Sequence, residues 1–151
     1  MPDHRAWLRG KTVLVTGGAY GIGRAIVMRA ATLGAASVVV LDLPGERRGA
    51  ERTAADARHL GSAAVFIGCD VSSGRQVKVA VEQALAACGG RLDVVYANAG
   101  IGSAKTWAHE LDDADFAKTI GVNLAGAFHT AKCAAGSHRH HLSTRRIRAA
   151  P

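Results

Sequence analysis

The chain has 151 residues, 48% of them hydrophobic and 21% charged, which is typical of one globular domain. It contains no apolar run of about 18 residues, the length that spans a membrane, and its N-terminus lacks the apolar core of a signal peptide. These features argue against membrane and secreted proteins, so we expect a cytoplasmic protein.

The net charge of +7 lies mostly at the C-terminal end. Residues 1–130 carry 14 Lys and Arg against 12 Asp and Glu, whereas residues 131–151 carry five basic residues and no acidic one. The body of the protein therefore has little positive charge in excess for binding nucleic acid, and we interpret the tail as a solvated basic segment. Binding of nucleic acid by the tail, around Arg145–Arg148, is the less favoured alternative.

Disulfides and metal sites are not expected. The cysteines are widely spaced and form no C-x-x-C pair, so we expect reduced thiols at Cys69, Cys88 and Cys133. The tail histidines have no neighbouring carboxylate or thiol to complete a metal site, so we predict no bound metal at His138, His140 and His141.

The predicted elements alternate between short strands and helices. After a polar lead-in, in which we expect Trp7 to pack on the domain, apolar β-branched runs predict strands at residues 13–16, 37–43, 63–69 and 92–96. Apolar positions at helical spacing predict helices at residues 22–33, 46–60 and 75–88, each followed by glycine. Ser72 or Ser73 is expected to cap the last of these helices.

This alternation predicts an α/β fold with a doubly wound parallel sheet, covered by helices on both faces. The right-handed crossover rule gives an incomplete Rossmann-like sheet of about four strands in the order 3-2-1-4. We assign residues 1–132 to this dinucleotide-binding domain and residues 133–151 to an irregular basic tail. The carboxyl ends of strands 1 and 4 then lie side by side.

The turn after the first predicted strand is typical of a nucleotide-binding corner. Gly17, Gly21 and Gly23 stand between an apolar strand and an Ala-rich helix. Glycine allows positive φ and a close approach of the backbone to a pyrophosphate, and the N-terminus of the helix favours its negative charge. An acidic residue about 20 positions further on, Asp42, completes the pattern.

Five motifs, in order, resemble the short-chain dehydrogenases/reductases, a family of Rossmann-fold oxidoreductases that use NAD or NADP. The resemblance covers residues 8–132, and its motifs are the glycine turn with Thr16 and Ile22, the acidic Asp42, the pair Asp70-Val71, the run Ala97-Asn98-Ala99-Gly100, and Val122-Asn123-Leu124. One position departs from the family pattern, because Ala97 stands where the family has Asn.

The resemblance implies a role for each matching position. The residues that it assigns to the cofactor are Thr16, Gly17, Tyr20, Gly21, Ile22, Gly23, Asp42, Asp70, Val71, Asn98, Ala99 and Gly100. It assigns Asn123 to catalysis, as the one family catalytic position that this sequence retains. For Asp70, a carboxylate at the N-terminus of a helix is a second interpretation, compatible with the first.

NAD is the expected cofactor. The Asp42 carboxylate can accept hydrogen bonds from both ribose hydroxyls and would repel a 2′-phosphate, and Tyr20 stands where NADP-using relatives often carry a basic residue. Arg47 and Arg48 are near enough in sequence to suggest binding of a 2′-phosphate. Their segment is rich in both charges, however, which favours a solvated helix face.

The catalytic Tyr-x-x-x-Lys of the family is absent from this sequence. Its two tyrosines, Tyr20 and Tyr96, precede Asn123 and are followed four residues later by Arg24 and Gly100. The serines beyond Asn123, Ser137 and Ser143, lack a strand context and are not expected to be catalytic. We therefore expect an N-terminal fragment with an altered end.

The expected function is that of a short-chain dehydrogenase acting on an alcohol or ketone with NAD, present as an N-terminal part. The alternative is a catalytically inactive NAD-binding fragment or binding module. Expected partners are the dinucleotide and, in the full-length parent, a small alcohol or ketone, with neither membrane nor nucleic acid. Self-association is expected through the exposed fourth strand, with Val94, Val95 and Tyr96 at the sheet edge.

Overall fold

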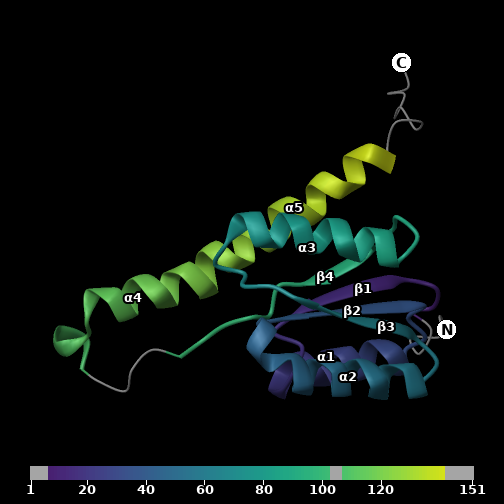
Figure 1. Cartoon of the computed structure of the whole chain (residues 1–151), viewed down its shortest axis with the longest axis horizontal. Coiled ribbons are helices and arrows are strands. Elements are labelled where there is room, and N and C mark those ends of the chain that lie inside the picture. Colours follow the sequence, from purple (N-terminus) through teal and green to yellow (C-terminus); the bar gives the residue numbers. More distant parts are fainter. Residues whose placement is uncertain (1–6, 103–106, 142–151) are drawn as a thin grey trace.

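The structure is a computed structural model that describes residues 7–102 and 107–141. Its centre is a parallel sheet in the order β3-β2-β1-β4 (Figure 1), which confirms the predicted topology. The strands are β1 Thr12–Thr16, β2 Ser37–Asp42, β3 Ala63–Gly68 and β4 Val94–Tyr96.

Five α-helices follow or connect these strands in the described part of the chain: α1 Gly21–Thr32, α2 Arg47–His59, α3 Gly74–Ala87, α4 Asp113–Ile120 and α5 Gly126–His141. Shorter helical segments are the 3-10 turns η2 Pro44–Glu46 and η3 Ala108–Glu110 and the π-helical η4 Gly121–Ala125. The predicted helix at 46–60 thus begins as a 3-10 turn at Pro44. Ser73, one of the two expected caps, accepts a hydrogen bond from the Gln76 amide at the start of α3.

The register aligns the strands along their full shared length. β1 pairs with β2 from Thr12↔Ser37 to Thr16↔Leu41, and β2 continues with β3 to Asp42↔Gly68. β4 pairs with β1 over three residues only, from Val13↔Val94 to Val15↔Tyr96. All the carboxyl ends lie at one edge of the sheet, because every pairing is parallel.

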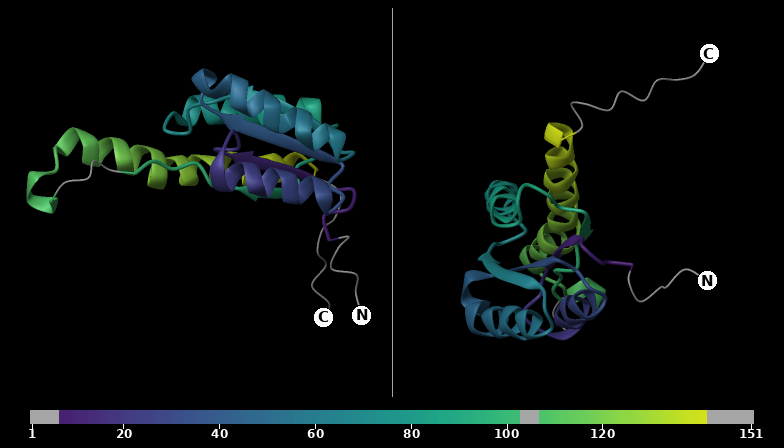
Figure 2. Two further views of the ribbon diagram at one scale, coloured as in Figure 1. Left: turned by 90° about the horizontal axis from the view of Figure 1, so that it is seen from below. Right: turned by 90° about the vertical axis from the view of Figure 1, so that its right-hand side faces the viewer.

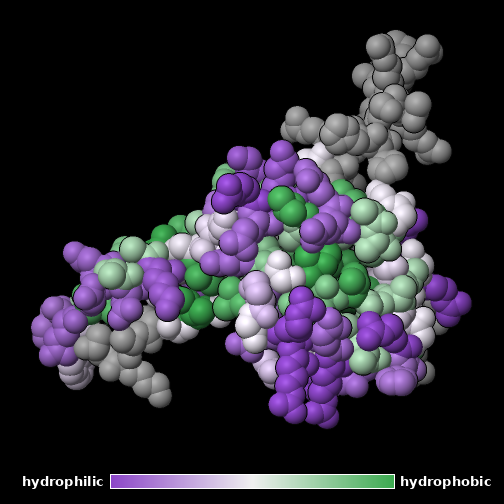
Figure 3. All heavy atoms as spheres, in the orientation of Figure 1, coloured by the Kyte–Doolittle hydropathy of each residue, from purple (hydrophilic) through white to green (hydrophobic). Residues whose placement is uncertain are grey.

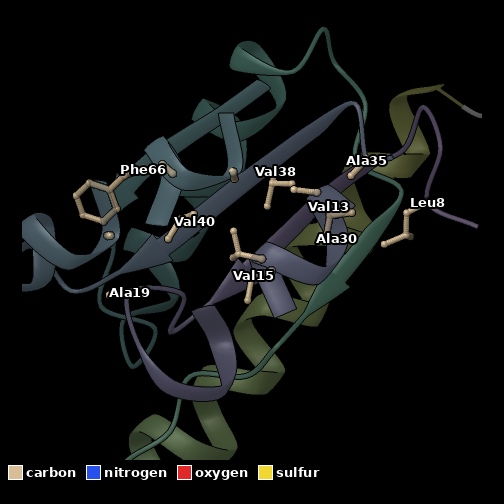
Figure 4. Close-up of a cluster of buried hydrophobic side chains, with 14 residues drawn as sticks. Leu8, Val13, Val15, Ala19, Ala30, Ala35, Val38, Val40 and Phe66 are labelled. Atoms are coloured by element: carbon tan, nitrogen blue, oxygen red, sulfur yellow. The ribbon is translucent and has the colours of Figure 1, made fainter. Parts of the chain in front are cut away.

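Helices cover both faces of the sheet, and alternate strand residues face each layer (Figure 2). On the face of α1 and α2, Val13, Val15 and Val40 join one buried apolar cluster, seen in Figure 4. On the face of α3 and α5, Leu14 and Val39 join the other. The central strands therefore read as continuous apolar runs in the sequence, as expected of strands buried on both sides.

The lead-in packs through a different residue from the one expected. Leu8 is buried, with 2% of its surface exposed, and belongs to the cluster of α1 and α2. Trp7, the predicted contact, is 67% exposed. Leu8 takes this place because the lead-in turns into β1 there, with the Lys11 amide donating to the Leu8 carbonyl.

A long helical segment formed by α4, η4 and α5 ends the described chain, and its α4 end projects beyond the sheet (Figure 1). Residues 133–141, expected as irregular, are helical. Cys133 and Ala134 pack on the cluster of α3, so tertiary contact extends the helix where the sequence shows little periodicity. The rest of the predicted tail, residues 142–151, lies outside the described residues, as do the side chains of Ser137 and of the three tail histidines.

None of the described helices is long and apolar enough to span a membrane.

Candidate functional site

A cavity of about 530 Å³ opens where the strands end. Turns that follow all four strands contribute to it, as does one face of the α4–η4 helix. Its lining residues are Gly17, Asp42, Leu43, Cys69, Asp70, Val71, Ser72, Ala99, Gly100, Ile101, Ala117, Lys118, Gly121 and Val122. The carboxyl end of a parallel sheet, beside the switch in strand order, is the usual ligand position in such folds.

A second cavity of about 240 Å³ adjoins the first and shares Gly17, Ala99 and Gly100 with it. Its remaining lining residues are Tyr20, Ile22, Gly23 and Asn98. The two cavities thus bring together most of the residues that the sequence assigned to a cofactor. Three of those assigned to a site, Thr16, Gly21 and Asn123, line neither cavity.

The glycine turn is sterically tight. Gly17 and Gly21 have φ of 67° and 53°, a region that favours glycine. A Cβ added at Gly23 would lie 1.9 Å from the Gly17 carbonyl oxygen, and one added at Gly17 would lie 2.9 Å from the Ala99 Cα. Only glycine fits at these positions while the turn keeps its shape.

The N-terminus of α1 has the features of an anion site. Tyr20, its N-cap residue, makes no side-chain capping hydrogen bond, and the first turn contains no acidic residue. The amide groups of that turn and the positive end of the helix dipole therefore carry no protein carboxylate. A phosphate group would complement them.

Asp42 ends β2 with both carboxylate oxygens held by backbone amides. Its Oδ2 accepts from the Ala19 amide at 2.8 Å and its Oδ1 from the Leu43 amide at 2.8 Å. These bonds fix the carboxylate beside the glycine turn. Each oxygen has a second lone pair, so the group can still accept from a ligand hydroxyl.

Asp70 organises the turn between β3 and α3. Its Oδ1 accepts from the Ser72 amide at 2.9 Å and from the Ser72 hydroxyl at 2.7 Å, and Ser73 serves as the helix cap. Asp70 therefore precedes the helix as a turn-forming carboxylate and lines the larger cavity as well. Both interpretations drawn from the sequence are compatible with this position.

Thr16 and Asn98 join the ends of β1 and β4. The Thr16 Oγ1 accepts from the Asn98 and Ala99 amides, each at 3.0 Å, and the Asn98 Nδ2 donates to the Thr16 carbonyl at 3.0 Å. Thr16 is only 1% exposed. The Thr16 hydroxyl therefore joins the turn after β4 to the glycine turn, and it does not face the cavity.

Asn123 lies in the π-helical segment η4, a type of local irregularity that is frequent at functional sites. Its Oδ1 accepts from the Ile101 amide at 2.8 Å, and its Nδ2 donates to the Ile101 carbonyl at 2.9 Å. This reciprocal pair ties the loop after β4 to the helix. Ile101 in turn lines the larger cavity.

The two tyrosines lie apart from each other. The Tyr20 ring rests against α2, since a Cβ added at Gly49 would come 2.2 Å from the Tyr20 Cζ. Tyr96 lines a separate apolar groove with Leu8 and Ile26, beside α1. Neither tyrosine is followed by a lysine four residues later.

Cys69 lines the larger cavity as a buried thiol, with 2% of its surface exposed. Burial raises its pKa to about 11, and the nearby Asp70 and Cys133 add to the rise. Cys69, Cys88 and Cys133 are all free cysteines. A neutral thiol at this place suits an apolar wall and not a nucleophile.

Several residues that line the larger cavity were not predicted from the sequence as site residues. Leu43, Ser72 and Ile101 directly follow recognised motif positions, so their proximity in sequence was an available signal. Gly121 directly precedes the motif residue Val122 and had the same signal. Ala117 and Lys118 gave none, because they reach the cavity only through the direction in which α4 returns toward the sheet. In the described part of the chain, no group of three His, Cys, Asp or Glu is placed to hold a metal ion.

Comparison with known proteins relates most of the chain to one family. A sequence profile described as short chain dehydrogenase matches residues 11–140. (-)-trans-Carveol dehydrogenase of Rhodococcus erythropolis is 35% identical over 139 residues, which cover 85% of this chain and 50% of the relative. A sorbose reductase of Schizosaccharomyces pombe is 39% identical over 132 residues, covering 87% and 50%.

Solved structures agree with the sequence relatives. An NAD+-bound xylitol dehydrogenase superposes with a TM-score of 0.83 at 30% identity, over 89% of this chain and 50% of that one. A short chain dehydrogenase/reductase from Burkholderia phymatum in complex with NAD gives 0.78 at 31% identity, over 85% and 44%. The chain therefore spans about half the length of the relatives it matches.

Proposed function

Because this chain belongs to the short-chain dehydrogenase family, we propose that it binds NAD in the two adjoining cavities and contributes to oxidoreduction of an alcohol or ketone. The observation that carries the proposal is the meeting of the glycine turn, Asp42 and Asp70 at one place. NAD-bound relatives of the same fold support it.

The residues present fit a dinucleotide. The glycine turn has no room for a Cβ at Gly17 or Gly23, and it leads into a helix N-terminus without an acidic residue, so it would hold the pyrophosphate. Asp42 would accept from the adenosine ribose hydroxyls. Asp70 and Val71 would border the adenine, and Asn98, Ala99 and Gly100 would border the nicotinamide half.

NAD is preferred to NADP in this proposal. The Asp42 carboxylate would repel a 2′-phosphate placed on the same ribose. Arg47, a nearby cation, forms an ion pair with Glu51 at 3.3 Å, and its guanidinium lies 5.2 Å from the centre of the Phe66 ring. Those contacts support the solvated-face interpretation of the α2 arginines.

NAD would supply the hydride acceptor or donor of the reaction. The residues of this chain would bind and orient the cofactor, and Asn123 would hold the loop at Ile101 beside it. No Tyr-x-x-x-Lys is present in these 151 residues to move the accompanying proton. The positions of Tyr20 and Tyr96 therefore favour a second candidate function, NAD binding without turnover.

A fluorescence titration with NADH tests the binding proposal. We expect saturable binding to the wild-type chain, weaker binding of NADPH, and about tenfold weaker NADH binding in Asp42→Asn, which removes charge-assisted hydrogen bonds. Glu51→Gln, an exposed change on α2, is the matched control and should bind as the wild type does. Absence of saturable binding at millimolar NADH contradicts the proposal.

Turnover separates the two candidate functions. A missing proton-transfer pair lowers the rate by roughly 10²- to 10⁴-fold. We expect the wild-type chain to bind NADH and yet, with NAD+ as the oxidant, to oxidise a panel of secondary alcohols far more slowly than a full-length relative assayed in parallel. Comparable rates would show that these residues suffice for catalysis.

Two further features complete the proposal. The outer edge of β4 would mediate self-association, since β4 pairs only with β1 among the described strands.

A cytoplasmic setting is supported by three free thiols, which persist in reducing compartments. The partners are then the dinucleotide, an alcohol or ketone, and a second copy of the chain, without nucleic acid.

A further inference from the structure

The turn between β3 and α3 forms one wall of the larger cavity. Most of its hydrogen bonds stay within the turn and the start of α3. Asp70 accepts from Ser72, and the Ser73 amide donates to the Asp70 carbonyl at 3.1 Å. The Asp70 amide donates to the Gln76 side chain at 3.0 Å. These bonds shape the turn, but they do not fasten it to the rest of the protein.

A histidine on α5 makes the connection to a separate element. The His129 Nδ1 lies 3.1 Å from the Val71 carbonyl oxygen. Because a carbonyl oxygen only accepts, Nδ1 must carry the hydrogen and donate it. Among the side chains that the structure describes, His129 alone donates to this turn from outside the segment of β3 and α3. The His129–Val71 bond therefore joins the cavity wall to α5.

Close packing fixes the imidazole at this place. A Cβ added at Gly126 would lie 2.7 Å from the Val71 Cγ2, so the backbone of α5 lies directly against Val71. A Cβ added at Gly74 would lie 3.2 Å from both the Cδ2 and the Nε2 of His129. Gly74 is the first residue of α3. The partly buried ring thus fills the space between the Val71 carbonyl and the start of α3.

We propose that His129 is a positioning residue of the cofactor cavity. Its Nδ1–H holds the Val71 carbonyl against α5 and so keeps the wall after β3 in the shape that binds the ligand. His129 does not line either cavity, and it acts through the backbone of Val71. A wall that is already ordered loses less conformational freedom when a ligand binds. This inference rests on the proposed binding of NAD, to which it adds a residue that no motif identifies.

The His129–Val71 bond also couples the cavity to α5. A ligand that orders the turn favours the bonded state, and by linkage the bonded state favours the ligand by the same factor. NADH should therefore slow hydrogen exchange of the amide groups at residues 127–134, because it lowers the population of locally open states there. These residues line neither cavity, so the ligand would not cover them directly.

Two substitutions at His129 separate this role from helix packing. Asparagine and leucine are similar in size, but only asparagine keeps a donor near the position of Nδ1. Leucine is the better helix former and is more often buried, so a role in packing alone ranks His129→Leu above His129→Asn. Positioning of Val71 gives the opposite order. Thr130→Val is the matched control, because the buried Thr130 Oγ1 bonds to the Gly126 carbonyl within α5 and away from the turn.

The experiment is a fluorescence titration of the full chain with NADH, together with hydrogen exchange measured by mass spectrometry. We expect His129→Leu to bind NADH about fivefold more weakly than the wild type, as for the loss of one hydrogen bond. His129→Asn should recover most of the affinity, and Thr130→Val should bind as the wild type does. NADH should slow exchange at residues 127–134 in the wild type and in His129→Asn, and not in His129→Leu.

The outcomes separate this inference from the proposed function. Wild-type affinity in His129→Leu would overturn the positioning role, as would weaker binding in His129→Asn than in His129→Leu. Unchanged exchange at residues 127–134 when the wild type binds NADH would overturn it too, and this measurement decides the matter if urea denaturation shows that His129→Leu is not folded. Each of these results leaves NAD binding intact. A wild-type chain that binds no NADH would overturn the proposed function and this inference together.

Discussion

The two sides of β1 differ in how completely they are packed. Toward β2, the sheet is closed: all five residues of β1 and the four central residues of β2 are buried. Toward β4, it is open: the three residues of β4 are only partly buried, and among the described strands β4 pairs with β1 alone. The glycine turn lies at the boundary between these two environments.

Apolar surface is concentrated on the open side and on the projecting helix. Phe116, Ile120, Leu124 and Phe128 are 56%, 39%, 64% and 60% exposed at intervals of four residues, and Figure 3 shows apolar side chains along this helix. A groove of about 330 Å³ lies between α1 and Tyr96. The closed side stabilises the fold, whereas the open side presents surface that a further chain or segment can cover.

The largest effect is expected where the closed side meets the glycine turn. Gly23→Ala places a methyl carbon 1.9 Å from the Gly17 carbonyl oxygen, far inside van der Waals contact, so the turn must shift, at a cost of about 3 kcal/mol. We expect loss of NADH binding and a lower denaturation midpoint in urea. Gly45→Ala, where an added Cβ meets no atom within 4 Å, is the control. Wild-type stability and binding in Gly23→Ala would show that the turn is not tight.

At the amino ends of the strands, away from the glycine turn, Asp93 and Arg91 form a clamp that joins β1 to the start of β4. The Asp93 Oδ2 accepts from the Thr12 amide at 2.8 Å, and Arg91 bonds both Asp93 and the Gly10 carbonyl. Asp93→Asn weakens these charge-assisted bonds, and we expect a loss of about 1 to 3 kcal/mol of unfolding free energy in urea. Glu82→Gln, an exposed change on α3, should lose almost nothing.

The same clamp predicts a dependence on pH. Burial raises the pKa of Asp93, but the Thr12 amide, Arg91 and Lys11 outweigh this and hold it below its ordinary value. Because the folded pKa lies below the unfolded one, the stabilisation is present above the ordinary carboxyl range and is lost as pH falls through the folded pKa. The difference in stability between wild type and Asp93→Asn should therefore shrink on acidification below about pH 4. A constant difference would exclude this linkage.

The open side should govern association. We expect the wild-type chain to sediment as concentration-dependent oligomers, and Tyr96→Lys to shift it toward monomer, because a charge on an edge strand opposes pairing. Phe128→Gln tests the projecting helix instead and should leave association unchanged. A monodisperse wild-type monomer at all concentrations would contradict edge pairing, and a monomeric Phe128→Gln would assign the contact to the helix.

The smallest effect concerns the thiol in the cavity wall. With its pKa raised to about 11, chiefly by burial, Cys69 carries less thiolate at pH 8 than an ordinary cysteine. We expect Cys69 to be the slowest of the three cysteines to react with iodoacetamide in the folded chain, and all three to react alike in urea. Mass spectrometry of peptides gives the rates. Rapid labelling of folded Cys69 would show that the cavity wall opens.

The closed side was the part most readily predicted. Apolar runs buried on both faces, glycines at the helix ends and the alternation of elements gave the strand order and most boundaries within two residues. The open side was harder, because its contacts depend on few residues. Trp7 was expected to pack, and Leu8 does so instead; residues 133–141 were expected as irregular, and they form helix.

For the site, the sequence by itself determined the chemistry of the motifs: a glycine turn where side chains do not fit, and acidic residues at the ends of β2 and β3. Their order and spacing along the chain are local properties, readable without coordinates of distant parts. Only the tertiary structure decided which side chains complete the cavity. Thr16 proved to be a buried clamp, Asn123 a tie to Ile101, and Lys118 a wall residue. The role of Thr16 arises from the pairing of β1 with β4. The roles of Asn123 and Lys118 arise from the path of the α4–η4 helix back across the strand ends, where it packs near Val71 and Ser72, and no local pattern encodes that path.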